Sequence, residues 1–344
     1  MNARRACAVA ALFAAIAACL FVDLDRERMW RSSEERCYAV VGEMVSSGDW
    51  LVPRLNGGVR LQKPPLFYWA AAAAAELADG LSVSTLRSVS ALAALALAAA
   101  VFKAGVSLGD FRTGALAAAA LGASWMFYDR GRTGDAEMLL ALLVFAALAL
   151  FERLWRTRDS RLLPVLALAV GLAFLTKATA ALLCIFAPIA VWLTVRHGWR
   201  LTLRPAVLGW STVALALSVS WYAVMLARVP DAAETFGAFA ASPFGIRAGT
   251  DARHLRELWY YFPRFPLGTV PVGLLLPWLA YEAYRQHFFR DEPRLQFWAL
   301  GFVASFLAWT FVPQKQMHYL LPLVPMQALV AARVIERRFL APRS

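Results

Sequence analysis

The stretch Glu34–Trp69, EERCYAVVGEMVSSGDWLVPRLNGGVRLQKPPLFYW, is a long polar interruption in a chain that otherwise reads as apolar helices. It combines an acidic pair, an amphipathic run, a turn rich in glycine and proline, and a lysine before two prolines. A simple tether between two membrane spans needs none of these features. The stretch therefore indicates a functional site held at one face of a membrane.

The composition of the 344 residues is that of an integral membrane protein. Hydrophobic residues make up 60% of the chain and charged residues 17%, and the mean hydropathy is +0.55, whereas a soluble protein carries more surface charge. The net charge of +12 does not indicate nucleic acid binding, because the basic residues lie between apolar runs, as in loops that face an anionic cytoplasmic leaflet. The four cysteines show no paired spacing, so neither a disulfide framework nor a zinc site is indicated.

The apolar runs predict an all-α, polytopic membrane protein with about ten transmembrane helices. Each run approaches the roughly 17–25 residues that cross the hydrocarbon core. The first run follows Arg4 and Arg5 and is interpreted as a signal anchor rather than a cleaved signal peptide, because many spans follow it. The predicted spans cover residues 6–22, 86–104, 111–128, 135–152, 162–177, 179–195, 205–227, 266–284, 295–312 and 317–334.

The short run 66–79, which ends at Glu76 and Asp79, decides the topology. If it does not cross, the basic loops all lie on the same side as Arg4 and Arg5, as the positive-inside rule favours. We therefore predict that both termini are cytoplasmic and that 66–79 is an interfacial or re-entrant helix. We expect one domain, 1–344, with periplasmic loops at about 23–85 and 228–265 and no C-terminal soluble domain.

This topology places candidate catalytic carboxylates together on the outer side. Glu34 and Glu35 follow the first span, and Asp135 and Glu137 begin a later one. A carboxylate there could act as a general base toward a hydroxyl or an amine. The alternatives are a solvated acidic loop for the first pair and compensation of the helix dipole for the second pair.

Three lysines also fall on the outer side, against the positive-inside trend, and so indicate an anionic partner. Lys63 is held at a defined position by the two prolines that follow it, Lys177 lies in a turn between two spans, and Lys315 lies about one helical turn before Tyr319. Each lysine could bind a phosphate as a point charge or could be a snorkelling side chain at the interface. His254 is the one histidine predicted on this side, which is weak support for a metal ion.

The order of these motifs resembles that of bacterial glycosyltransferases that use a lipid-linked sugar donor. These are the relatives of the lipid A aminoarabinose transferase and, more distantly, the protein O-mannosyltransferases of the GT-C fold. The resemblance runs from about residue 20 to residue 334. The matching motifs are the acidic pair with Tyr38, the run SGDWLVPRLNG at 47–57, KPPLFYW at 63–69, GRTGDAE at 131–137, GLAFLTK at 171–177, His254 with WYY at 259–261, and Lys315 with YLLPL at 319–323.

The resemblance implies a GT-C fold in the bacterial inner membrane and an inverting transfer at the periplasmic face. The sugar would come from a polyprenyl-phosphate donor of the undecaprenyl type, and the acceptor would be a lipid, a glycan or a protein. The site residues that it implies are the catalytic carboxylates Glu34, Glu35 and Glu137, with Glu34 as the base, the phosphate-binding residues Lys63, Arg132, Lys177, Lys315 and Tyr319, and His254 as a ligand of a divalent metal ion.

Two positions depart from the pattern of that family. The family has Asp followed by Glu where this chain has Glu34 and Glu35, and it has Glu where this chain has Gln62, which is a poorer metal ligand. These departures keep open an alternative function, that of a catalytically inactive homologue that binds polyprenyl phosphate or acts as a partner subunit. A transporter is disfavoured, because the spans show neither charged residues at their centres nor an inverted repeat.

Overall fold

The computed structural model describes residues 3–25, 29, 31–241, 256–285, 287 and 291–340. These residues form helices and one short β-hairpin, as the apolar runs predict. The α-helices are α1 Ala3–Phe21, α2 Ser32–Ser47, α3 Leu66–Leu77, α4 Val83–Leu108, α5 Phe111–Gly122, α6 Trp125–Gly131, α7 Ala136–Thr157, α8 Leu163–Ala181, α9 Ala187–Val195, α10 Pro205–Arg228, α11 Ala232–Ala241, α12 Tyr261–Gly268, α13 Leu276–Arg285, α15 Pro293–Thr310 and α16 Val324–Ile335. The strands are β1 Arg54–Leu55 and β2 Gly58–Val59, and short 3-10 or π-helical turns lie at Ser160–Leu162, Leu182–Phe186, Trp199–Leu201, Leu258–Tyr260, Val272–Leu275, Met317–Leu323 and Glu336–Leu340.

Six segments of the described chain are long and apolar enough to cross a membrane, where ten spans were predicted. The six are Ala3–Phe21, Val83–Leu108, Ala136–Thr157, Ser160–Val195, Pro205–Arg228 and Met317–Leu340. Two of the predicted spans are interrupted, because 111–128 divides into α5 and α6, and 266–284 divides into α12, a 3-10 turn and α13. The segment Ser160–Val195 holds two predicted spans, and 295–312 corresponds to α15, which is not among the six. Helix α3 has 12 residues, about 18 Å of length against a core of about 30 Å. Its length therefore agrees with the prediction that 66–79 does not cross.

The segment Ser160–Val195 is a hairpin of two helices rather than one long span. The rings of Phe174 and Phe186 lie 6.2 Å apart, although twelve residues of a straight helix rise about 18 Å. The chain reverses at Lys177, whose φ of −163° and ψ of 88° are not helical. The predicted turn at Thr176 and Lys177 is thus present, and α8 and α9 are its two arms.

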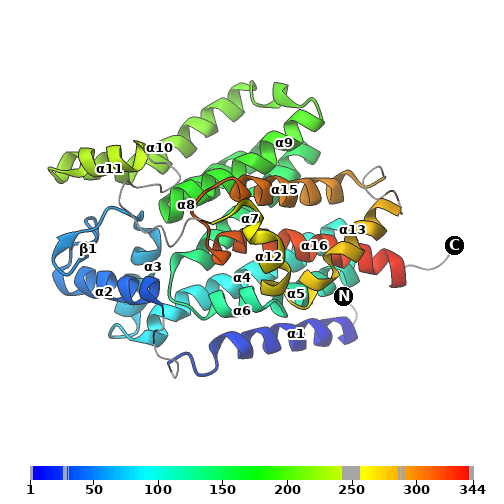
Figure 1. The fold of residues 1–344 in the computed structure, drawn as a ribbon, viewed down its shortest axis with the longest axis horizontal. Coiled ribbons are helices and arrows are strands. Elements are labelled where there is room, and N and C mark those ends of the chain that lie inside the picture. The colour runs from blue at the N-terminus through cyan, green and yellow to red at the C-terminus, as the bar shows by residue number, and fades with distance from the viewer. Residues whose placement is uncertain are drawn as a thin grey trace.

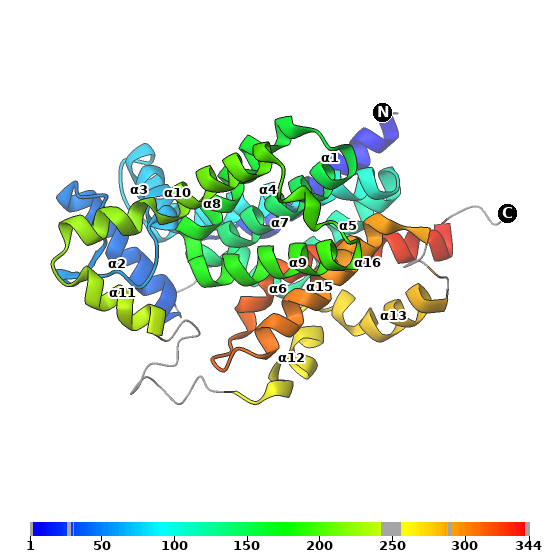
Figure 2. The same ribbon diagram turned by 90° about the horizontal axis from the view of Figure 1, so that it is seen from above.

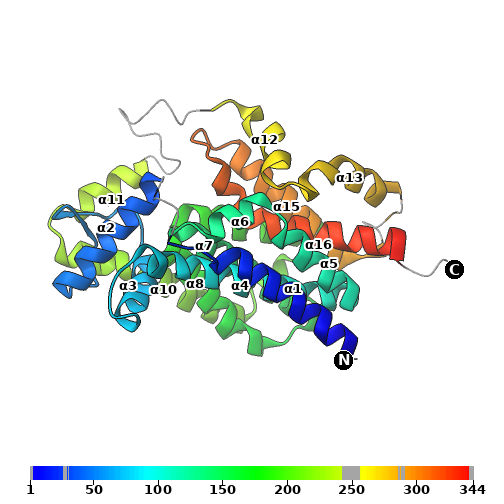
Figure 3. The ribbon, with the colours of Figure 1, turned by 90° about the horizontal axis from the view of Figure 1, so that it is seen from below.

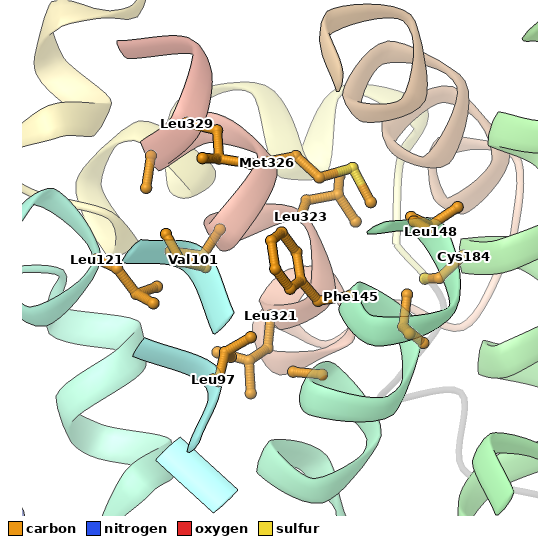
Figure 4. Close-up of a cluster of buried hydrophobic side chains, with 14 of the residues drawn as sticks. Leu97, Val101, Leu121, Phe145, Leu148, Cys184, Leu321, Leu323, Met326 and Leu329 are labelled. Carbon is orange, nitrogen blue, oxygen red and sulfur yellow. The ribbon is translucent and has the colours of Figure 1, made fainter. Parts of the chain in front are cut away.

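The core of the bundle lies where α4, α5, α7 and α16 pack together (Figure 4). Leu97 and Val101 of α4, Phe145 of α7 and Met326 of α16 are fully buried there. Helices α4 and α5 approach closely, because a Cβ on Gly105 would lie 2.8 Å from the Cα of Gly114. This packing fixes α7, which carries Glu137 in its first turn.

A cap formed by α2, α3 and the β-hairpin lies at one end of the bundle (Figure 1), and α11 lies beside it (Figure 3). The hairpin turns at Asn56 and Gly57, whose φ values of 54° and 76° are those of a tight two-residue turn. Backbone N–H groups of both residues donate to the Glu43 carboxylate of α2. The indole of Trp221 donates to the carbonyl of Leu51 at 3.0 Å, which ties the cap to α10.

Candidate functional site

The first turn of α7 holds two buried carboxylates at the end of the bundle that the cap covers. Asp135 is the N-cap residue and accepts a hydrogen bond from the backbone N–H of Glu137 at 3.1 Å. The other oxygen of Asp135 accepts from Arg130 and from Ser33 of α2. Asp135 therefore has the capping role expected at a helix N-terminus, and it positions Glu137 two residues further along.

Glu137 contacts two cationic or ionisable side chains through one oxygen and none through the other. Its Oε1 accepts from the Lys177 ammonium at 2.6 Å and lies 3.5 Å from Nε2 of His318. Its Oε2 is buried and has no hydrogen-bond partner in the described part of the chain. A buried acceptor without a partner costs about 1–3 kcal/mol. This oxygen is therefore placed to accept a hydrogen bond from a bound molecule.

The side of this pair away from α7 is formed by the 3-10 turn Met317–Leu323. The Lys177 ammonium lies 4.3 Å from the ring centre of Tyr319, a cation–π contact, and the His318 ring lies edge-on to the same ring. The structure brings Lys177, Tyr319 and Glu137 together, as the motifs suggested. His318 was missed because the sequence assigned it to the start of an apolar span, 317–334. A histidine directly beside Tyr319 was the signal that could have found it.

Lys63 lies on the cap side of the same site, next to the prolines that precede α3. Burial alone would lower the pKa of this ammonium, but the negative charge of Cys37, Glu137, Tyr68 and Asp135 outweighs burial and raises it. Burial also raises the pKa of the Cys37 thiol to about 12.

Glu34, the carboxylate expected to act as the base, is held in a buried ion pair. Arg87 of α4 donates to it through Nε at 2.7 Å and through Nη2 at 3.0 Å, and the backbone N–H of Gly134 donates at 2.8 Å. Both carboxylate oxygens are thus occupied, which argues against Glu34 as a free base. Glu35 is exposed on the outer face of α2. Of these three carboxylates, Glu137 alone has a buried oxygen without a described partner.

Two of the expected phosphate-binding residues contact backbone carbonyl groups instead. Arg132 donates through Nη1 and Nη2 to the carbonyls of Cys19, Val22 and Asp23 at the C-terminal end of α1. These groups carry the negative end of the helix dipole, so the guanidinium has a structural role there. Lys315 is buried and donates to the carbonyl of Arg256 at 3.3 Å.

The expected metal site has no support from the described residues. They contain no group of three or more His, Cys, Asp or Glu side chains that could hold a metal ion. Gln62 is exposed, and His254 lies outside the described residues.

Comparisons with known proteins find similarity to glycosyltransferases. Residues 62–223 match the family described as dolichyl-phosphate-mannose-protein mannosyltransferase. The undecaprenyl phosphate-alpha-4-amino-4-deoxy-L-arabinose arabinosyl transferase 2 of Proteus mirabilis is 28% identical over 317 residues, 90% of this chain and 56% of that protein. The corresponding transferase of Pseudomonas aeruginosa strain LESB58 is 28% identical over 349 residues, 98% of this chain and 61% of that protein. The chain thus spans less than two thirds of the length of these relatives.

Solved structures agree with the sequence comparisons. ArnT from Cupriavidus metallidurans bound to undecaprenyl phosphate superposes with a TM-score of 0.83 and 25% identity, over 97% of this chain and 61% of that chain. The archaeal oligosaccharyltransferase AglB from Archaeoglobus fulgidus gives a TM-score of 0.57 and 14% identity, over 99% of this chain and 52% of that chain. The second likeness shows a shared fold alone.

Proposed function

We propose that this polytopic membrane chain, which is similar to aminoarabinose transferases of the GT-C superfamily, transfers a sugar from a polyprenyl-phosphate donor to a lipid, glycan or protein acceptor. The observation that carries the proposal is the ion pair of the buried Glu137 with the half-buried Lys177, in which one carboxylate oxygen has no partner among the described residues. A base and a cation in contact suit a reaction that removes a proton and releases a phosphate.

In the proposed site, the ammonium groups of Lys63 and Lys177 bind the carrier phosphate. Both charges act on Glu137, so the two lysines lie on either side of one small region. Two fixed cations would stabilise the negative charge that develops on a leaving phosphate. Tyr319 holds the Lys177 ammonium over its ring and limits the positions that it can take.

The proposed step is a single inverting displacement. The hydroxyl or amine of the acceptor attacks the anomeric carbon of the sugar from the face opposite the phosphate, and Oε2 of Glu137 takes its proton. The bond between that carbon and the phosphate oxygen breaks, and polyprenyl phosphate leaves with the electron pair. Glu34 has a positioning role in this scheme, because its Oε1 holds the backbone of Gly134, two residues before the start of α7.

The basic residues suggest which side of the membrane the site faces. Arg4 and Arg5 at the start of α1, and Arg158 after α7, lie at the end of the bundle away from Glu137. We infer from the positive-inside rule that this end, with both termini, is cytoplasmic, and that the site faces the periplasm of the inner membrane.

A second candidate function is supported by the contacts of Glu34. If the reaction needs a free carboxylate from the first loop, the ion pair with Arg87 removes it, and the protein would bind polyprenyl phosphate without turnover. The two functions differ in whether free polyprenyl phosphate is released from a sugar-loaded carrier.

The test is transfer from a panel of polyprenyl-phosphate sugars in reconstituted membranes, with wild type, Glu137→Gln and Lys177→Met compared. We expect transfer by the wild type, loss of transfer with retained carrier binding in Glu137→Gln, and weakened carrier binding in Lys177→Met. Carrier binding without transfer from any donor would favour the second candidate. Full activity of Glu137→Gln would exclude Glu137 as the base.

A further inference from the structure

A large apolar groove lies on the side of the bundle formed by α8, α9 and α10. Its volume is about 630 Å³, and its walls include Val170 of α8, Ile189 of α9 and Leu215 of α10. Helix α10 packs beside α8 (Figure 2), but only four of its 24 residues are buried, and Leu215 is 62% exposed. The groove is therefore accessible from the surrounding lipid.

The length of the groove suits one hydrocarbon chain. Along α8 its lining runs from Leu163 to Phe174, a distance of about 17 Å at 1.5 Å per residue. One leaflet contributes about 15 Å of hydrocarbon. A chain that enters from either surface would fill the groove without reaching the opposite surface.

The two ends of the groove differ in polarity. At the end near Lys177, the aromatic rings of Phe174 and Phe186 contact each other across it. At the other end the lining includes Trp199, Thr202 and Trp210. Tryptophan is enriched at the level of the lipid headgroups, so the headgroup of a bound lipid belongs at this second end.

Unpaired positive charge is concentrated beside this second end. The Arg158 guanidinium lies 4.2 Å from the ring centre of Trp155, and a Cβ on Gly198 would lie 2.3 Å from the same indole. This contact places Arg158 beside the loop that carries Trp199. This loop continues to Arg204, the residue directly before α10, and burial and the charge of Arg204 lower the pKa of Arg158. Neither forms an ion pair with a described residue.

Helix α10 adds to this positive potential. It begins directly after Arg204 and has neither an acidic residue in its first turn nor a side-chain cap. The partial positive charge of its N-terminus is therefore uncompensated. An apolar groove, two adjacent arginines and an uncapped helix end converge on one ligand chemistry, a phosphate attached to a hydrocarbon chain.

We propose that the groove binds an anionic phospholipid from the leaflet opposite the candidate site. One acyl chain lies between the hairpin arms and α10, and the phosphate lies between Arg158 and Arg204. This proposal does not depend on the transfer reaction. A carrier with its phosphate at Lys177 would have to pass its tail between the rings of Phe174 and Phe186 to enter the groove. Its phosphate would then lie at the opposite end of the groove from Arg158 and Arg204.

Native mass spectrometry of the purified protein, titrated with phosphatidylglycerol or phosphatidylcholine, tests the proposal. We expect one tightly held phosphatidylglycerol in the wild type. In Arg158→Gln/Arg204→Gln we expect about 30-fold weaker binding, from the contribution of two basic side chains near a lipid phosphate. Ser211→Phe places a ring in the groove without changing a charge and should lose both lipids.

The matched control is Arg4→Gln/Arg5→Gln, which removes two charges at the same end of the bundle but on α1. It should bind phosphatidylglycerol as the wild type does. Equal retention of the two lipids by the wild type, or unchanged binding in the Arg158 and Arg204 variant, would overturn the proposal. Displacement of phosphatidylglycerol by polyprenyl phosphate would assign the groove to the carrier tail and overturn it as well.

Discussion

The ion pair of Glu34 and Arg87 gives a prediction that separates a structural role from a catalytic one. The two side chains are 3% and 4% exposed. Three donors face the two oxygens of Glu34, namely Nε and Nη2 of Arg87 and the N–H of Gly134. In Glu34→Gln the amide nitrogen must face at least one of these donors, and Arg87 loses the carboxylate that its Nε and Nη2 groups contact. Loss of one partner of a buried pair costs about 3–5 kcal/mol.

The assay is unfolding of the purified protein in one detergent, monitored by heat or denaturant. Glu34→Gln should lower the free energy of unfolding by about 3 kcal/mol, near the lower end of that range because one amide oxygen can still accept from Arg87. Glu35→Gln is the matched control, since this neighbour is exposed, and it should change stability little. Glu34→Gln/Arg87→Met should recover part of the loss, because the buried guanidinium is removed together with the carboxylate that it contacts.

One combination of stability and activity would refute the structural role of Glu34. If Glu34→Gln is as stable as the wild type and loses transfer while it keeps carrier binding, Glu34 acts on the substrate and the structural role is wrong.

Three further predictions concern the residues around Glu137. Glu137→Gln should lower the transfer rate by about 10²-fold or more with carrier affinity retained, in a single-turnover assay; a change confined to KM would contradict the role of base. Because the pKa of Lys63 is raised, its charged form is present below that pKa and lost only as pH rises through it. The ratio of carrier affinities between the wild type and Lys63→Met should therefore stay constant between about pH 7 and pH 9; a ratio that falls with a midpoint in that range would contradict this. His318→Phe keeps the ring contact with Tyr319 but removes the nitrogen beside Glu137. It should lower the transfer rate about 10-fold, and His318→Gln should recover part of that rate. Equal rates in both variants and the wild type would show that His318 has no role in transfer.

The sequence predicted the parts of the fold that depend on local pattern. The hairpin turn at Lys177 and the short helix 66–79 followed from run lengths and from charge placement. The count of spans did not, because breaks such as that between α5 and α6 at Ala123 and Ser124 depend on packing against neighbouring helices. Hydropathy alone does not report such breaks.

Some of the residues named from the sequence lie together in the candidate site, but their contacts could not be predicted. Glu137, Lys177 and Tyr319 contact one another through Lys177. The ion pair of Glu34 could not be read from the sequence, because its partner Arg87 lies 53 residues away at the start of an apolar run. Arg132 is similar, since its carbonyl partners lie on α1, more than 100 residues earlier. Long-range pairings of this kind are properties of the packed structure.

In the proposed reaction, Glu137 takes a proton from the acceptor, and the two lysines stabilise the carrier phosphate that leaves. The most direct measurement is the release of free polyprenyl phosphate from a sugar-loaded carrier in reconstituted membranes, with and without added acceptor lipid. We expect the wild type to release polyprenyl phosphate only when acceptor is present, and Glu137→Gln to release none above background. Equal release by both proteins, or no release by the wild type with any donor sugar, would contradict it.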